Sequence, residues 1–195
     1  MKILKHLKSW EGFLAIILLV IVIVNSLISE SFLSIENQIN LFVLSIEKVI
    51  IVLVMAKIII NAEIDLSVAS MMGLSACALG WFVESGMPMT MALIASITIG
   101  AIGGAFNGFW ITVVKLPSLV VTLAMLIGFR GIARVLIGDR SIKMFPQWFE
   151  DLGQQPFFWH IPFSVMIFLV LLICVVIILQ YTGFGRHIYI IGINQ

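Results

Sequence analysis

Long apolar runs alternate with short polar breaks along most of the chain. About 20 apolar residues are enough for a helix to cross the hydrocarbon layer of a membrane. Six runs approach this length, over residues 13–28, 41–60, 66–83, 89–114, 119–137 and 163–180. Glycine, proline, asparagine or acidic residues separate these runs. The pattern predicts an all-α, polytopic helical membrane protein with about six transmembrane helices.

The composition supports a membrane protein and excludes several other classes. Hydrophobic residues make up 62% of the 195 residues and charged residues 11%, whereas soluble chains carry about 25% charged residues. The formal net charge is +1, and the chain has only two cysteines. These values exclude a disordered chain, a disulfide-rich secreted domain and a basic nucleic-acid-binding protein. We therefore expect a single transmembrane domain over residues 1–195, with a lipid bilayer and no nucleic acid as its partner.

The distribution of lysine and arginine predicts which helix ends face the cytoplasm. No small-residue cleavage site follows Asn25, so the first run is expected to remain as a membrane helix. With the amino terminus inside, the outer loops hold only Arg140 and Lys143. The inner segments then hold Lys2, Lys5, Lys8, Lys57, Lys115 and Arg186. Because positive loops stay in the cytoplasm, this pattern predicts that both termini are cytoplasmic.

The second apolar run is interrupted by Glu47, Lys48 and Lys57. Each charge near the centre of a membrane helix costs about 2.5–3.5 kcal/mol on the insertion scale. Either the helix follows the outer interface to about Lys48 and enters the membrane from Val49, or its charges pair with neighbouring helices. Both alternatives stay open.

The outer loop over residues 138–162 is the longest connection between two runs. It carries three prolines and a group of aromatic residues between Trp148 and Trp159. Aromatic rings favour the headgroup layer, so the segment is predicted to form an interfacial hairpin. A flexible connector is the alternative.

Glycines line one face of the fourth run. Gly100, Gly104 and Gly108 recur at steps of four residues, which places them on the same side of a helix. Small residues let membrane helices approach closely, so this face is predicted to pack against another helix. Asn107 beside it either donates a hydrogen bond across helices or lines a polar path, and the first is favoured.

Two arginines lie near the outer end of the fifth run. Arg130 and Arg134 are four residues apart and therefore share a face. They are predicted to be interfacial anchors, with contact to an outside partner or a polar solute as the alternative.

Two carboxylates precede the third run, in the stretch NAEIDLSVAS. Either Asp65 or Ser67 is expected to cap the following helix. Glu63 and Asp65 also raise the idea of an intramembrane hydrolase, which ranks last because residues two apart point apart on a helix. The sequence has no GxxxxGK[ST] loop and no set of metal-ligating residues. We expect no catalytic residue, cofactor or metal, and an energy source supplied by a partner or a gradient.

Three blocks, in order, resemble the permease subunit of bacterial ATP-driven importers of the ribose and simple-sugar type. They are IDLSVAS from residue 64, the long segment from GAIGGAFNG at residue 100 to Ile142, and TGFGRHIYIIGIN from residue 182. The matching motif residues are Ile64, Asp65, Leu66, Ser67, Asn107, Pro117, Thr122, Arg130 and Gly131.

The resemblance implies a non-enzymatic transport subunit in the bacterial inner membrane. It implies a second permease subunit, alike or a sibling, two ABC ATPase subunits that hydrolyse ATP, and a periplasmic solute-binding protein as partners. Gly185, Arg186 and His187 are then expected near the ATPase contact, and Arg130, Arg134 and Arg140 near the binding protein. The solute is a simple sugar or sugar-like molecule, and the branch that imports the autoinducer-2 signal is not separated from it.

The chain departs from the family in two respects. Ala62 and Glu63 stand where the family has two glycines, and Lys57 stands where an apolar residue is usual. The chain is also shorter than a type II importer permease of about ten helices, each of about 20 residues. We therefore expect an amino-terminal part of such a permease, which lacks the coupling helix and does not transport alone. A non-transporting fragment that pairs with full-length permeases is the alternative function.

Overall fold

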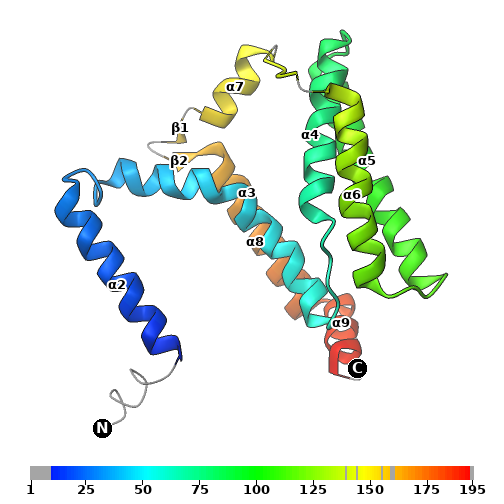
Figure 1. The fold of residues 1–195 in the computed structure, drawn as a ribbon, viewed down its shortest axis with the longest axis horizontal. Coiled ribbons are helices and arrows are strands. Elements are labelled where there is room, and N and C mark those ends of the chain that lie inside the picture. Colours follow the sequence, from blue (N-terminus) through cyan, green and yellow to red (C-terminus); the bar gives the residue numbers. More distant parts are fainter. Residues whose placement is uncertain (1–9, 139, 144, 155, 159–160, 194–195) are drawn as a thin grey trace. The chain divides into compact units, whose positions relative to one another are not determined.

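The computed structural model describes residues 10–138, 140–143, 145–154, 156–158 and 161–193. These residues form helices and one short two-stranded sheet (Figure 1). In order the elements are α2 (Trp10–Ile28), α3 (Ile35–Ile60), α4 (Val68–Glu84), α5 (Met89–Thr112), α6 (Ser118–Ile137), α7 (Gln147–Gln154), β1 (Pro156–Phe158), β2 (Ile161–Pro162), α8 (Phe163–Tyr181) and α9 (Gly183–Ile193). The predicted all-α class is confirmed.

Each of the six apolar runs coincides with one helix. Among the described residues, α5, α6 and α8 are long and apolar enough to cross a membrane, and α2 and α4 contain shorter apolar helices. The ends of α4, α5, α6 and α8 lie within two residues of the predicted ends. The number of crossings and the cytoplasmic position of both termini stay predictions.

The chain divides into two compact units, Met1–Ile46 and Glu47–Gln195. The boundary falls inside α3, next to the charged pair that the sequence identified as a break in the second run. The first unit contains α2 and the amino-terminal part of α3. The second contains the remainder, including every residue discussed below.

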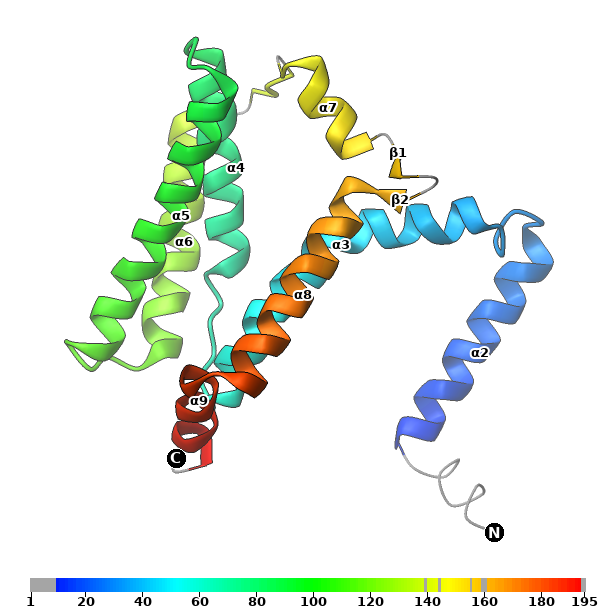
Figure 2. The ribbon, with the colours of Figure 1, turned by 180° about the vertical axis from the view of Figure 1, so that it is seen from behind.

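Within the second unit, α4, α5 and α6 form an antiparallel three-helix bundle, and they lie side by side in both views (Figures 1 and 2). Leu74, Phe129 and Ala133 form its buried core, from α4 and α6. Met71, Cys77, Ile99, Met125 and Leu136 pack around this core. The core is apolar, as expected for helices that associate mainly through close packing.

Close approach of α5 to its neighbours occurs at Gly103. A Cβ added there would lie 1.9 Å from Met71 Cε and 3.3 Å from Phe129 Cζ. The predicted glycine face is rotated from this contact: Gly100 lies against Ser75, whereas no described atom lies within 4 Å of a Cβ built at Gly104 or Gly108.

The segment between α6 and α8 is folded. Arg140 forms an ion pair with Glu84 at 3.5 Å, and Ile142 packs over Gly80 on α4. The helix α7 follows, and then β1 and β2 pair as an antiparallel hairpin with Pro156 opposite Pro162. A hairpin is therefore present, while its position at the membrane interface stays a prediction. Trp159 lies outside the described residues.

Substitution of Gly103 by leucine is expected to destabilise the three-helix bundle, because the new side chain overlaps the positions of Met71 and Phe129. Overpacking of this kind costs about 1–3 kcal/mol. Gly131→Leu is the matched control, since Gly131 is a helix-interior glycine with open space around it. The midpoint of thermal unfolding in detergent is the measurement. Equal shifts for the two variants would contradict the assigned contact.

Candidate functional site

The site is built on the non-helical segment between α3 and α4. The end of α3 is closed by two backbone hydrogen bonds, from Ala62 N to Ile59 O at 2.9 Å and from Glu63 N to Ile58 O at 3.1 Å. This is the hydrogen-bond pattern of a Schellman C-cap, with Ala62 at the position that usually holds glycine. The chain then continues through Asp65 without helical structure until α4 begins.

Ala62 adopts a left-handed backbone conformation, with a φ of 56°. A residue with a Cβ pays about 1–2 kcal/mol in this region. The sequence resemblance implied glycine at this position, and this chain carries alanine at the one residue of the segment whose backbone favours glycine.

A chain of hydrogen bonds ties this segment to α5. Asp65 Oδ1 accepts from Ser67 N at 2.8 Å and from Ser67 Oγ at 2.7 Å. Ser67 Oγ in turn accepts from Asn107 Nδ2 at 2.8 Å. The predicted hydrogen bond of Asn107 across helices is thereby confirmed. Ser67 occupies the predicted N-cap position of α4, but it makes no side-chain capping bond to the helix because its hydroxyl donates to Asp65.

A second set of hydrogen bonds ties the same segment to α6. Ser118 Oγ donates to Glu63 Oε2. Thr122, which is only 1% exposed, donates to Ser118 O at 2.8 Å and lies 3.4 Å from Ile64 O. One segment is therefore held from two sides by residues that follow their partners by 40 to 58 positions.

These groups surround a pocket of about 260 Å³. Its walls come from the end of α3, the non-helical segment, the carboxyl-terminal half of α5 and the start of α6. The polar lining residues are Asn61, Glu63, Asp65, Asn107, Ser118 and Thr122. Gly104 and Gly108 also line it, so these two glycines open onto a polar pocket in this chain.

Both carboxylates face this one pocket. The sequence argument that Glu63 and Asp65 point apart assumed a helix, and the segment is not helical. Each carboxylate has one oxygen bonded to a serine, and no described group of three His, Cys, Asp or Glu side chains is placed to hold a metal ion. The arrangement is suited to binding hydrogen-bond donors.

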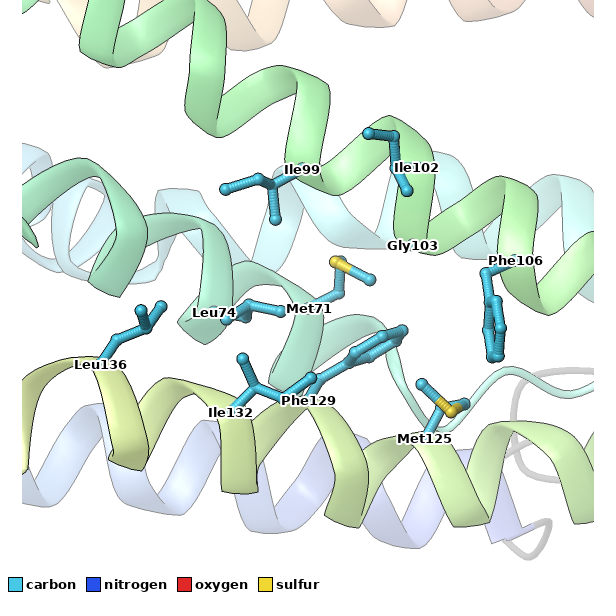
Figure 3. A pocket seen from close by; sticks show the side chains of 10 residues that line it. All are labelled: Met71, Leu74, Ile99, Ile102, Gly103, Phe106, Met125, Phe129, Ile132 and Leu136. Atoms are coloured by element: carbon cyan, nitrogen blue, oxygen red, sulfur yellow. The ribbon is translucent and has the colours of Figure 1, made fainter. Parts of the chain in front are cut away.

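A larger pocket of about 420 Å³ lies between α4, α5 and α6 (Figure 3). Figure 3 shows Met71, Met125 and Phe129 pointing into it, together with isoleucine and leucine side chains. Its lining is apolar, so it offers no directional recognition of a polar ligand.

Five of the predicted motif residues meet at the polar pocket or its hydrogen bonds: Ile64, Asp65, Ser67, Asn107 and Thr122. Leu66 and Pro117 are exposed, and Pro117 stands at the N-cap of α6. Arg130, Gly131 and Arg134 are exposed on α6 and do not line the polar pocket. Asn61 and Ser118 were missed, although Ser118 follows the motif proline directly.

The segment predicted near the ATPase contact forms α9. Arg186 and His187 are exposed, whereas Gly185 is buried. A Cβ added at Gly185 would lie 2.1 Å from Leu179 O, and one added at Gly192 would lie 1.8 Å from Ile60 O. Backbone therefore packs on backbone at both glycines, and α9 contacts the end of α3 directly before the site segment.

Comparison with known proteins gives one family match. Residues 37–195 match the family described as branched-chain amino acid transport system / permease component. The chain is similar to the autoinducer 2 import system permease protein LsrD of Escherichia coli (strain K12), Escherichia coli O9:H4 (strain HS) and Shigella flexneri. In each case 34% of 149 aligned residues are identical, which cover 73% of this chain and 45% of the relative. The chain thus spans less than half the length of these relatives. No solved structure matches significantly.

Replacement of Ala62 by glycine is expected to raise the midpoint of thermal unfolding, because glycine adopts the left-handed conformation without the Cβ penalty. The expected gain is up to about 1 kcal/mol. Ala101→Gly, in the interior of α5, is the matched control and should lower the midpoint. A loss of stability in Ala62→Gly would show that the left-handed turn does not form.

Proposed function

Because the chain belongs to the family of branched-chain amino acid transport system permease components, we propose that it is the membrane-spanning permease component of an ATP-binding-cassette importer for a simple sugar or sugar-like solute. Permeases of this family are non-catalytic, multi-pass subunits of bacterial importers. The chain therefore forms part of a solute path through the inner membrane, and separate subunits hydrolyse ATP.

One observation carries this proposal: five of the nine motif residues meet at one polar pocket or its hydrogen bonds. Asp65, Asn107 and Thr122 come from three separate places in the sequence and line the same pocket. Buried polar groups in folded proteins nearly always have partners, and here the partners gather around one pocket.

The partners follow from the importer assignment. A second permease subunit completes the path, two ATPase subunits dock from the cytoplasm, and a periplasmic binding protein delivers the solute. Arg186 and His187 present exposed polar groups on α9 and are assigned to the ATPase side. Arg134 and Arg140 are assigned to the opposite side, where Arg140 is already paired with Glu84.

The solute assignment has one finer candidate. The LsrD relatives are named as permeases of autoinducer 2 import, and they share 34% identity with this chain. That similarity favours a small, furanose-like oxygenated solute within the broader sugar class.

A non-transporting role in pairing with full-length permeases is the second candidate. It is favoured by Gly104 and Gly108, whose faces have no described atom within 4 Å of an added Cβ. Glycines without a packed neighbour allow a helix of another membrane protein to approach closely.

The proposed topology predicts the location of reporter domains fused to the chain. Alkaline phosphatase fused after Gly86 or after Gln147 should be active, because both positions are assigned to the periplasm. Fusions after Lys115 or Gln195 should be inactive, since these positions are assigned to the cytoplasm. Inactive fusions at both Gly86 and Gln147 would overturn the orientation.

The ATPase contact predicts a position-specific crosslink. Arg186→Cys, in a background with Cys77→Ala and Cys174→Ala, should crosslink to the ATPase subunit of the same importer when membranes are treated with a maleimide–succinimidyl ester reagent, which joins the new thiol to a lysine amine. Arg134→Cys is the matched control, because it replaces an equally exposed arginine assigned to the other side. Gel mobility and immunoblotting detect the product. Crosslinking at Arg134→Cys alone, or at neither position, would contradict the assignment.

A further inference from the structure

The hydroxyl groups that line the polar pocket are already used as hydrogen-bond donors. Ser118 donates to Glu63, and Thr122 donates to backbone oxygen. Asn107 Nδ2 uses one of its two N–H groups on Ser67 Oγ. Beside the remaining amide hydrogens of Asn61 and Asn107, the walls carry several acceptor oxygens.

Two buried amide oxygens in this pocket lack any partner. They are Asn61 Oδ1 and Asn107 Oδ1, and Asn107 is only 6% exposed. In the described part of the chain, Ser164 Oγ is the only other buried side-chain oxygen or nitrogen without a hydrogen-bond partner. Buried polar groups in folded proteins nearly always have partners, so two unpaired acceptors in one pocket point to a ligand or to water.

The carboxylates add further acceptors. The described hydrogen bonds use Oδ1 of Asp65 and Oε2 of Glu63. Asp65 Oδ2 and Glu63 Oε1 take part in none of them. Four acceptor oxygens therefore belong to residues that line the same pocket, three from residues 61–65 and one from α5.

The size of the pocket limits which ligands with hydrogen-bond donors fit into it. Its volume of about 260 Å³ is room for about eight water molecules, far more than one dehydrated cation fills. Ile58, Ile64 and Ile111 provide apolar wall between the oxygens. A compact ring that carries several hydroxyl groups matches both the spaced acceptors and the apolar surface.

We propose that this pocket binds a small, neutral, polyhydroxylated solute, whose hydroxyl groups donate to Asn61 Oδ1, Asn107 Oδ1 and the free carboxylate oxygens. The inference rests on the proposed importer function, which brings such a solute to this site. It adds the residues that contact the solute and the direction of the hydrogen bonds.

The test is protection of a pocket cysteine by D-ribose. Ile111→Cys, in the Cys77→Ala and Cys174→Ala background, places a thiol on the apolar wall of the pocket in the full chain, reconstituted in lipid nanodiscs. Ribose is expected to slow maleimide labelling several-fold, by the factor 1 + [ribose]/Kd. Val113→Cys, exposed beyond the pocket at the end of α5, is the matched control and should label at the same rate with and without ribose.

Two variants examine the assigned oxygens. Asn61→Ala removes an unpaired oxygen whose residue makes no described side-chain hydrogen bond, so it should weaken protection while leaving the unfolding midpoint unchanged. Asn107→Leu should abolish protection. If ribose protects Ile111→Cys equally in wild type and both variants, the assigned contacts are wrong.

Other outcomes separate this inference from the function it rests on. Protection by ammonium chloride but not by ribose would identify a cation site and overturn the proposal. Absence of protection by ribose, together with a persistent Arg186→Cys crosslink to the ATPase, would reject the solute site and leave the importer assignment standing. Loss of that crosslink as well would reject both.

Discussion

The structure depends on how the non-helical segment between α3 and α4 is satisfied. A segment without helical structure leaves backbone polar groups and, here, two carboxylates in need of partners, and each buried group without a partner is costly. The Schellman closure at Ala62 satisfies the end of α3, and Asp65 accepts the N–H of Ser67 at the start of α4. Asn107 and Ser118 complete the set from α5 and α6. The segment thereby fixes how three helices meet, through polar contacts in a bundle whose remaining core is apolar.

The same hydrogen bonds leave acceptor oxygens free at the pocket. The hydroxyls of Ser67 and Ser118 each donate to one carboxylate oxygen, whereas Thr122 donates to the backbone carbonyl of Ser118. The opposite oxygens of Asp65 and Glu63 are left over by this arrangement. In each carboxylate one oxygen holds the segment in place and the other is left for a ligand. A change such as Asp65→Ala would therefore affect both protein stability and ligand binding.

Sequence reasoning located the helices well because a membrane-crossing helix is a local feature. Hydrophobic runs of sufficient length, bounded by glycine, proline or charge, define α4, α5, α6 and α8 without knowledge of their neighbours. The face that each helix turns toward its partners is not local. Successive residues on a helix are separated by about 100° around the helix axis. Only the packed structure therefore shows that the close contact lies at Gly103 and not at Gly104. The partnership of Ser118 with Glu63, across 55 residues, was hidden for the same reason.

The contact of α9 with the end of α3 lies directly before the polar pocket along the chain. Gly192 lies against Ile60 O so closely that a single methyl group would overlap the carbonyl. Because backbone atoms meet there, no side-chain rotamer can make room for that methyl group. The next residues are Asn61, which lines the pocket, and Ala62, whose left-handed φ is the point where the chain changes direction. Alanine restricts this point more than glycine does, because the Cβ narrows the accessible backbone angles. The end of α3 and the start of the pocket segment are therefore fixed by one backbone contact and one restricted turn.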